Sequence, residues 1–245
     1  MMNQRGQIMI FVVTALLIIV AVAVYFVWIS PSSSIGRITG LSFESCVESA
    51  SVEAIKELEK TAGIESKFTY PYNGDKVPYL CYTDEFYKTC TVQEALLTRQ
   101  FEKNLKALTK DKVQSCYDSN VNSLRSQGYE VKEGQLEFEP SLELGRVKIS
   151  IKAPTTIDSA SFSKVDLSFQ SPIYEMLMFA STITQQEARF GDSDLDSLRL
   201  YYPDYIFLKT KRGDGTTIYT IKSKKFGDEI SFASKSLPWP AGYER

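Results

Sequence analysis

The sequence predicts an α+β fold in which an N-terminal transmembrane helix precedes an extracytoplasmic domain with a helical half and a mainly antiparallel β half. Residues 8–29 carry no charged side chain, and a helix of that length covers roughly 33 Å, enough to cross the hydrocarbon core of a bilayer. Residues 41–128 show the three- and four-residue apolar spacing of helices, whereas residues 129–245 contain short segments of alternating apolar and polar side chains. We therefore expect a tail (1–7), a membrane span (8–29), a linker (30–40) and these two halves.

Charged and aromatic residues orient the expected span. Arg5 is the one basic side chain before it, and Tyr25 and Trp28 lie near its far end, where aromatic residues favour the membrane interface. Four cysteines follow the span, and cysteines that form disulfides are typical of an oxidising exterior. These features favour a single-pass protein with a cytoplasmic N-terminus, an extracytoplasmic C-terminal domain and the lipid bilayer as a partner.

A cleavable signal peptide is an alternative to the anchor. Ala21-Val22-Ala23 has the small-x-small form of a cleavage site. Cleavage there would leave the apolar residues 24–29 exposed at the new N-terminus, which is unfavourable in water. The sequence therefore favours a retained anchor.

The elements of the helical half follow from apolar spacing and capping residues. A helix is expected from about residue 41 to 62, with Gly63 as its C-terminal cap. Residues 70–75 are expected to form a turn before a short strand at 77–82. Two further helices are expected, one starting at Thr91 and one starting near Asp111 and ending before Gly128.

The β half is predicted to contain strands around one helix and one hairpin. The expected strands are 135–139, 146–152, a third marked by Phe162, Val165, Leu167 and Phe169, and a final strand at 229–233. Ser171-Pro172 has the form of a helix start, and the helix is expected to run to about residue 189. The clearest hairpin joins 205–211 to 216–222 through Arg212-Gly213-Asp214-Gly215.

The four cysteines allow three disulfide pairings, which a sequence alone does not distinguish. We favour Cys81 with Cys90 as a local link, and Cys46 with Cys116 as a link between two helices, because both of the latter lie on predicted apolar helical faces. A metal site is disfavoured because no Cys-x-x-Cys spacing is present.

Composition limits the chemistry. The chain contains no histidine, which removes imidazole bases and the commonest zinc ligand sets. Its 28 basic and 30 acidic residues give no basic excess for nucleic acid. We therefore assign no catalytic, metal or cofactor residue and expect a non-enzymatic protein. An extracytoplasmic hydrolase that works through carboxylates or a metal, without histidine, is a lesser alternative.

Three polar motifs have structural interpretations that we favour. Asp192, Asp194 and Asp196 have the opening of a calcium loop, but Ser197 and Pro203 occupy the places of its glycine and glutamate, which favours a solvated loop and a short helix. Arg212-Gly213-Asp214 matches an adhesion tripeptide, although a hairpin turn requires the same residues. Glu137 and Glu139 alternate with apolar residues and are expected to face water.

Short motifs are spread over most of the chain: Arg5-Gly6-Gln7, Ser45-Cys46-Val47-Glu48-Ser49, Pro78-Tyr79-Leu80-Cys81-Tyr82, Gln114-Ser115-Cys116 and Phe232-Ala233. In these motifs the chain resembles a group of uncharacterised membrane-anchored surface proteins of small-genome archaea. The resemblance implies a cell-surface location and no particular activity. We expect a binding or envelope-assembly role, with other envelope or surface proteins, or further copies of the chain, as partners.

Arg5-Gly6-Gln7 before a long apolar run also resembles the processing site of archaeal type IV pilin precursors. This resemblance implies cleavage after Gly6, with Gln7 as the first mature residue, and a filament subunit as the alternative function. Two features depart from the pilin pattern: Phe11 occupies the fifth mature position, where glutamate is frequent, and Ser30-Pro31 interrupts a continuous stalk helix.

Overall fold

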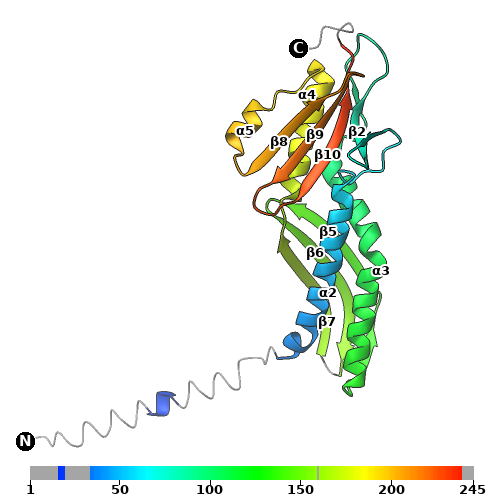
Figure 1. Ribbon diagram of the computed structural model, residues 1–245. Coiled ribbons are helices and arrows are strands. Elements are labelled where there is room, and N and C mark those ends of the chain that lie inside the picture. Colours follow the sequence, from blue (N-terminus) through cyan, green and yellow to red (C-terminus); the bar gives the residue numbers. More distant parts are fainter. Residues whose placement is uncertain (1–15, 20–33, 159, 239–245) are drawn as a thin grey trace, which may run out of the picture. The chain divides into compact units, whose positions relative to one another are not determined.

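The computed structural model describes residues 16–19, 34–158 and 160–238 (Figure 1). Contacts between Cα atoms divide the chain into two compact units, residues 1–42 and residues 43–245.

Most of the expected membrane span lies outside the described residues. Of residues 8–29, only 16–19 are described, and they are helical. Gly6 and Gln7, the expected processing site, also lie outside the described part. Within the described part, no helix combines the length and the apolar character needed to cross a bilayer.

The first long helix, α2 (Ser34–Glu59), begins earlier than expected. Residues 34–40, predicted to belong to a linker, are helical, which corrects that prediction. Ile35, Ile38 and Leu41 extend the three-residue apolar spacing toward the N-terminus, and this pattern outweighs the turn preference of the preceding serines. The helix ends at Glu59, earlier than the predicted residue 62. Gly63, the predicted cap, adopts φ +71°, and its N–H donates to the Leu58 carbonyl at 2.8 Å.

The two helices expected between Thr91 and Gly128 are one helix, α3 (Leu97–Ser126). Asp111, predicted to start a helix, lies in the middle of α3. Its side chain is exposed to solvent, and a charged residue on the exposed face of a helix costs little. Thr91 belongs instead to a two-residue strand, β3 (Thr91–Val92). One face of α3 is buried along its whole length, including Phe101, Leu105, Val113, Tyr117, Val121 and Leu124.

The larger sheet has the strand order β1-β2-β10-β9-β8, with β3 also paired to β2. Its other strands are β1 (Thr69–Tyr72), β2 (Asp75–Tyr82), β8 (Tyr205–Lys211), β9 (Thr216–Ser223) and β10 (Glu229–Lys235). Among its described strands all pairings are antiparallel except that of β2 with β10. Because β2 comes from the predicted helical half and β10 from the β half, the two halves share this sheet.

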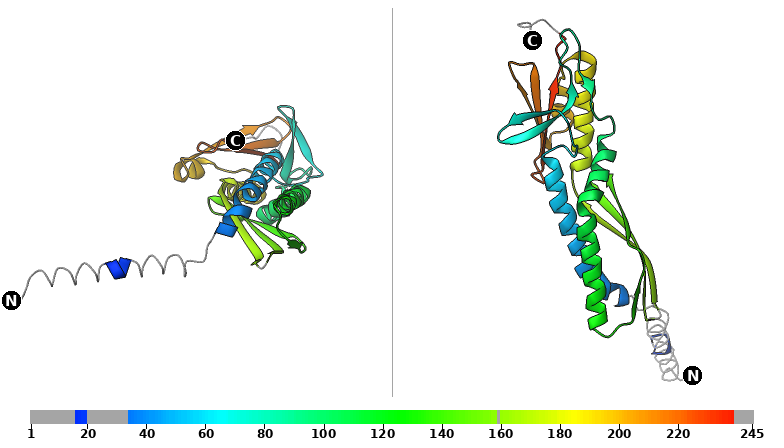
Figure 2. Two further views of the ribbon diagram at one scale, coloured as in Figure 1. Left: turned by 90° about the horizontal axis from the view of Figure 1, so that it is seen from below. Right: turned by 90° about the vertical axis from the view of Figure 1, so that its right-hand side faces the viewer.

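The smaller sheet has β6 as its central strand, with β4 and β5 on one side and β7 on the other. Its strands are β4 (Val131–Glu133), β5 (Glu137–Glu143), β6 (Arg146–Ile157) and β7 (Ala160–Gln170). Helices cover one face, as Figure 2 shows for α3 and the adjoining part of α2. On that face Val147, Ile149 and Ile151 are almost fully buried, while Glu137 and Glu139 are exposed, as predicted.

The helix α4 (Ile173–Phe190) contacts strands of both sheets. Ser171 accepts a hydrogen bond from the Ile173 N–H at 3.3 Å, which agrees with the predicted helix start. Ile173, Met176 and Leu177 are completely buried. The short helix α5 (Asp196–Tyr201) follows and contacts β8.

Both favoured disulfides are present. Cys46 is bonded to Cys116, and Cys81 to Cys90. Cys116 is buried as expected, and Cys81 and Cys90 are buried as well, but Cys46 is exposed, contrary to its predicted place on the buried face of its helix. The bond therefore joins the outer flank of α2 to the buried face of α3. In the chain-entropy model a loop of this length stabilises the fold by about 4 kcal/mol, and the local link by roughly 3 kcal/mol.

Gly63→Ala should destabilise the protein by about 3 kcal/mol. The positive φ is unfavourable for alanine, and the new methyl group would collide with the Phe101 ring. A Cβ at Gly63 would lie 2.1 Å from Cδ2 of the buried Phe101 ring. Gly74→Ala is the matched control: Gly74 also has positive φ, but a Cβ there meets nothing within 4 Å. We expect Gly74→Ala to cost only about 1 kcal/mol in urea unfolding. Equal losses for the two variants would show that the Phe101 contact is unimportant.

Candidate functional site: a disulfide-closed aromatic loop

Residues 82–89, here called the aromatic loop, leave the end of β2 and return to the sheet at Cys90. The Cys81–Cys90 disulfide closes the loop, with the two Cα atoms 5.2 Å apart. Near its centre Phe86 is 66% exposed and Tyr87 is 71% exposed. Two neighbouring aromatic side chains at this exposure are costly in water and are typical of contact surfaces.

Tyr87 also has an unusual backbone conformation. Its φ is +62°, in the left-handed region, which costs an L-residue with a bulky side chain about 1–2 kcal/mol. Residues held in such conformations require support from their surroundings, and they are concentrated at functional sites. Here the strain is in the same residue that presents its ring to solvent.

Hydrogen bonds fix both ends of the aromatic loop. The Thr83 N–H donates to the Lys235 carbonyl, and the Leu237 N–H donates to the Lys88 carbonyl, each at 3.0 Å. The Cys90 N–H donates to Ser236 Oγ at 3.0 Å. The loop is therefore attached to the strand and tail that follow β9, as well as being closed by its disulfide.

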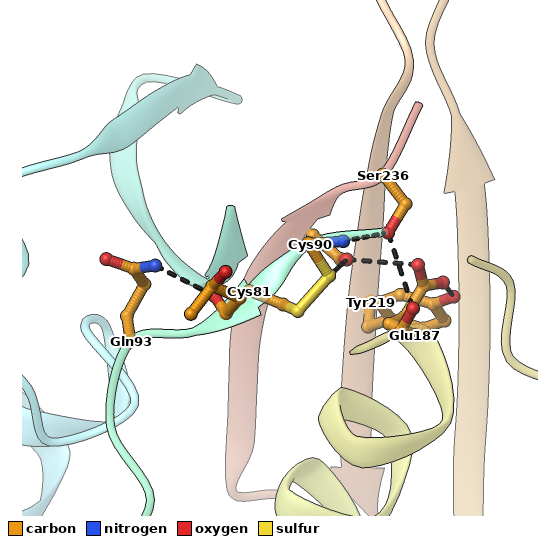
Figure 3. Close-up of a disulfide and its surroundings, with 8 residues drawn as sticks. Cys81, Cys90, Gln93, Glu187, Tyr219 and Ser236 are labelled. Atoms are coloured by element: carbon orange, nitrogen blue, oxygen red, sulfur yellow. Dashed lines mark hydrogen bonds between the residues drawn. A yellow bond between two sulfur atoms is a disulfide. The ribbon is translucent and has the colours of Figure 1, made fainter. Parts of the chain in front are cut away.

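A buried polar network lies behind the disulfide (Figure 3). Glu187, near the end of α4, is 1% exposed and accepts hydrogen bonds from the Tyr219 hydroxyl and, at 3.0 Å, from the Ser234 hydroxyl. Ser234 Oγ lies 3.4 Å from Cys90 Sγ. Ser236 Oγ donates to the Glu187 carbonyl at 3.4 Å, so the network joins α4 to the base of the aromatic loop.

Burial sets the protonation of this network. Desolvation raises the pKa of Glu187 above its ordinary value, although the hydrogen bonds from Tyr219 and Ser234 oppose the rise. Desolvation also raises the pKa of Tyr219, and the neighbouring Glu187 raises it further. Tyr219 therefore remains a neutral donor. Glu187 and Tyr219 are at most 1% exposed, so the network is shielded from solvent. It supports the aromatic loop from the interior of the protein.

A second group of acids lies where α2 ends. Glu59 is 8% exposed, and burial, followed by the nearby Asp228 carboxylate, raises its pKa to about 8. Burial likewise raises the pKa of Asp228, while Lys56 lowers it. The Oε1 atom of Glu59 has no hydrogen-bond partner in the described part. The pair connects the C-terminal turn of α2 to the turn between β9 and β10.

The remaining sequence candidates have local partners. Asp192 forms ion pairs with Lys209 and Lys211, and Asp196 forms one with Arg199. The described residues contain no cluster of three or more potential metal ligands.

The Arg-Gly-Asp tripeptide lies at the β8–β9 turn, as predicted. The Arg212 guanidinium lies 5.1 Å from the centre of the Tyr72 ring, and Asp214 accepts the Thr216 N–H at 3.0 Å. The Arg212 side chain therefore packs the turn against the β1–β2 hairpin, and the Asp214 side chain stabilises the turn itself.

A surface hollow of about 260 Å³ lies between residues 64–68 and the start of α3. Two of its polar side chains already make local bonds: Gln93 donates to the Thr91 carbonyl at 2.8 Å, and Glu94 accepts the Leu96 N–H at 2.9 Å. The hollow is therefore a weaker candidate than the aromatic loop.

Glu59 and Glu187 were not identified from the sequence, although a signal for both is present. Each lies four residues after a buried isoleucine, Ile55 or Ile183, and therefore on the apolar face of its helix. A charged residue on such a face indicates a paired or protonated side chain. Their partners, Asp228 and Tyr219, come from distant strands and follow only from the tertiary fold.

Comparison of this chain with protein-family models, with curated proteins and with solved structures gave no match.

The buried pair predicts a pH-dependent stability. Glu59 has a pKa of about 8 in the folded protein and close to 4.3 when unfolded, so between these values the folded state binds more protons. The free energy of unfolding should therefore fall as pH rises from about 4.5 to 8, by roughly 4 kcal/mol from this group. Glu59→Gln should remove that part of the pH dependence.

Urea unfolding at pH 5 and pH 8.5 measures this effect. Glu57→Gln, an exposed change on the same helix, is the matched control and should keep the wild-type pH dependence. If Glu59→Gln and Glu57→Gln lose the same stability between the two pH values, the pair does not hold a proton.

Proposed function

We propose that this chain is a single-pass, membrane-anchored surface protein whose extracytoplasmic domain binds another envelope protein through the aromatic loop. The observation that carries the binding role is the pair Phe86 and Tyr87, exposed on a loop held at both ends. A rigid loop loses little conformational entropy on binding, so its aromatic rings retain more of their contact energy.

The location rests on two separate features. The uncharged residues 8–29 have the length and composition of a membrane anchor. The two disulfides fit an oxidising exterior and would not be maintained in a reducing cytosol. The partner is proposed to be a protein, because exposed aromatic side chains are enriched at protein–protein contact surfaces.

Site-specific photocrosslinking of the full chain in native membranes tests the binding role. A photoreactive phenylalanine analogue at position 86 or 87 should yield a crosslinked adduct of defined mass. The same analogue at Leu144, which is 73% exposed in the β5–β6 turn, is the matched control and should yield none. An identical pattern at 86, 87 and 144 would argue against a specific role for the aromatic loop.

A type IV pilin-like filament subunit is the second candidate, because Arg5-Gly6-Gln7 precedes the apolar stretch. Mass spectrometry of the mature protein separates the two proposals. A first residue of Gln7 together with surface filaments would support the pilin-like subunit, whereas an intact N-terminus would support the retained anchor.

A further inference from the structure

The strand β7 is an open border of the smaller sheet. It is 11 residues long, and among the described strands it pairs with β6 alone, as Figure 1 shows. A long strand with one unpaired edge presents a row of N–H and C=O groups that readily pair with another chain. Proteins either shield such an edge or use it as an interface.

The register with β6 shows which backbone groups face the open edge. Ser171 donates its N–H to the Gly145 carbonyl at 3.2 Å, directly beyond the pair Arg146 with Gln170. Hydrogen-bonded and non-hydrogen-bonded pairs alternate along an antiparallel ladder. In the regular part of the ladder, odd-numbered residues of β7 therefore bond to β6, and the backbone groups of Lys164 and Asp166 point outward.

The charges on β7 favour one register for a second copy. If an antiparallel copy pairs about a two-fold axis at Val165, Lys164 of each copy lies opposite Asp166 of the other. Shifting the axis by one residue places Lys164 opposite Lys164, or Asp166 opposite Asp166. Opposite charges stabilise a cross-strand pair and like charges destabilise it. Of these three registers, only the one centred on Val165 places both Lys164 and Asp166 opposite a residue of opposite charge.

We propose that two copies of this chain form a symmetric dimer by pairing β7 with β7, antiparallel, about an axis at Val165. The backbone groups match in this register because outward-facing residues pair with outward-facing residues. Val165 lies on the core-facing side, only partly buried and packed against the hydrophobic core, so the second copy also covers the border of the core. This interface is separate from the aromatic loop and does not depend on the proposed function.

The charged pair sets the register and contributes little of the affinity. Within one copy Lys164 Nζ lies 3.0 Å from Asp166 Oδ2, with the two side chains 52% and 40% exposed. Asp166 also accepts the Ser150 hydroxyl at 2.6 Å. Exposed ion pairs of this kind are weak, so backbone hydrogen bonds and the covered apolar border supply the stability of the dimer.

A charge exchange tests the register with the full chain purified in mild detergent, by measuring the mass of the assembled particles over a range of concentrations. Wild type should form dimers. Lys164→Asp alone brings aspartate opposite aspartate, and Asp166→Lys alone brings lysine opposite lysine, so each should dissociate about tenfold more readily. An equal mixture of the two variants, with different tags, should recover wild-type dimerisation because every facing pair is again opposite in charge.

Lys132→Asp is the matched control, since Lys132 is an exposed charge on β4, across the sheet from β7; it should leave the dimer unchanged. In a second measurement, Val165→Cys should give a disulfide-linked dimer on mild oxidation, because residues on the axis form a close non-hydrogen-bonded pair. A wild-type chain that remains monomeric at every concentration overturns the proposal. Single variants that dimerise like wild type, or a mixture that fails to recover, overturn the register centred on Val165.

Discussion

Burial of the apolar face of α4 against both sheets is the interaction on which the rest of the fold depends. Ile173, Met176 and Leu177 are completely buried in a hydrophobic cluster that also contains residues of both sheets and of α3. Both sheets therefore share one hydrophobic core instead of having two small ones, which would be only marginally stable. The same helix carries Glu187 to the base of the aromatic loop, so the core and the candidate site depend on one element.

Local patterns predicted most elements, and long-range pairings set the limits of that prediction. The hairpin of β8 and β9, the start of α4 and the cap at Gly63 are determined by a few neighbouring residues, and all were predicted. The parallel pairing of β2 with β10 joins residues about 150 positions apart, and no local pattern indicates it. The single helix α3 was read as two because Asp111 resembles a cap, although an exposed charge does not interrupt a helix.

The candidate site was predictable in its covalent part and not in its supporting part. The Cys81–Cys90 link followed from the short spacing of the two cysteines, and the exposed aromatic residues lie between them. The exposure of Cys46 was missed because helical spacing gives only the approximate direction of a side chain. The polar network behind the disulfide requires α4, β9 and β10 to meet, so a glutamate on an apolar helix face was its one local signal.

The energetics of the aromatic loop explain why it requires two kinds of support. The left-handed conformation of Tyr87 costs about 1–2 kcal/mol, and the disulfide across this short loop contributes roughly 3 kcal/mol by restricting the unfolded chain. The disulfide can therefore offset the strain, but it acts mainly on the unfolded state and does not by itself select one folded loop conformation. That selection falls to the hydrogen bonds from Thr83 and Leu237 and to the one from Cys90 to Ser236. Because Ser236 in turn bonds to the Glu187 carbonyl, the loop conformation is linked to the packing of α4, and the aromatic rings are presented only when the core has formed.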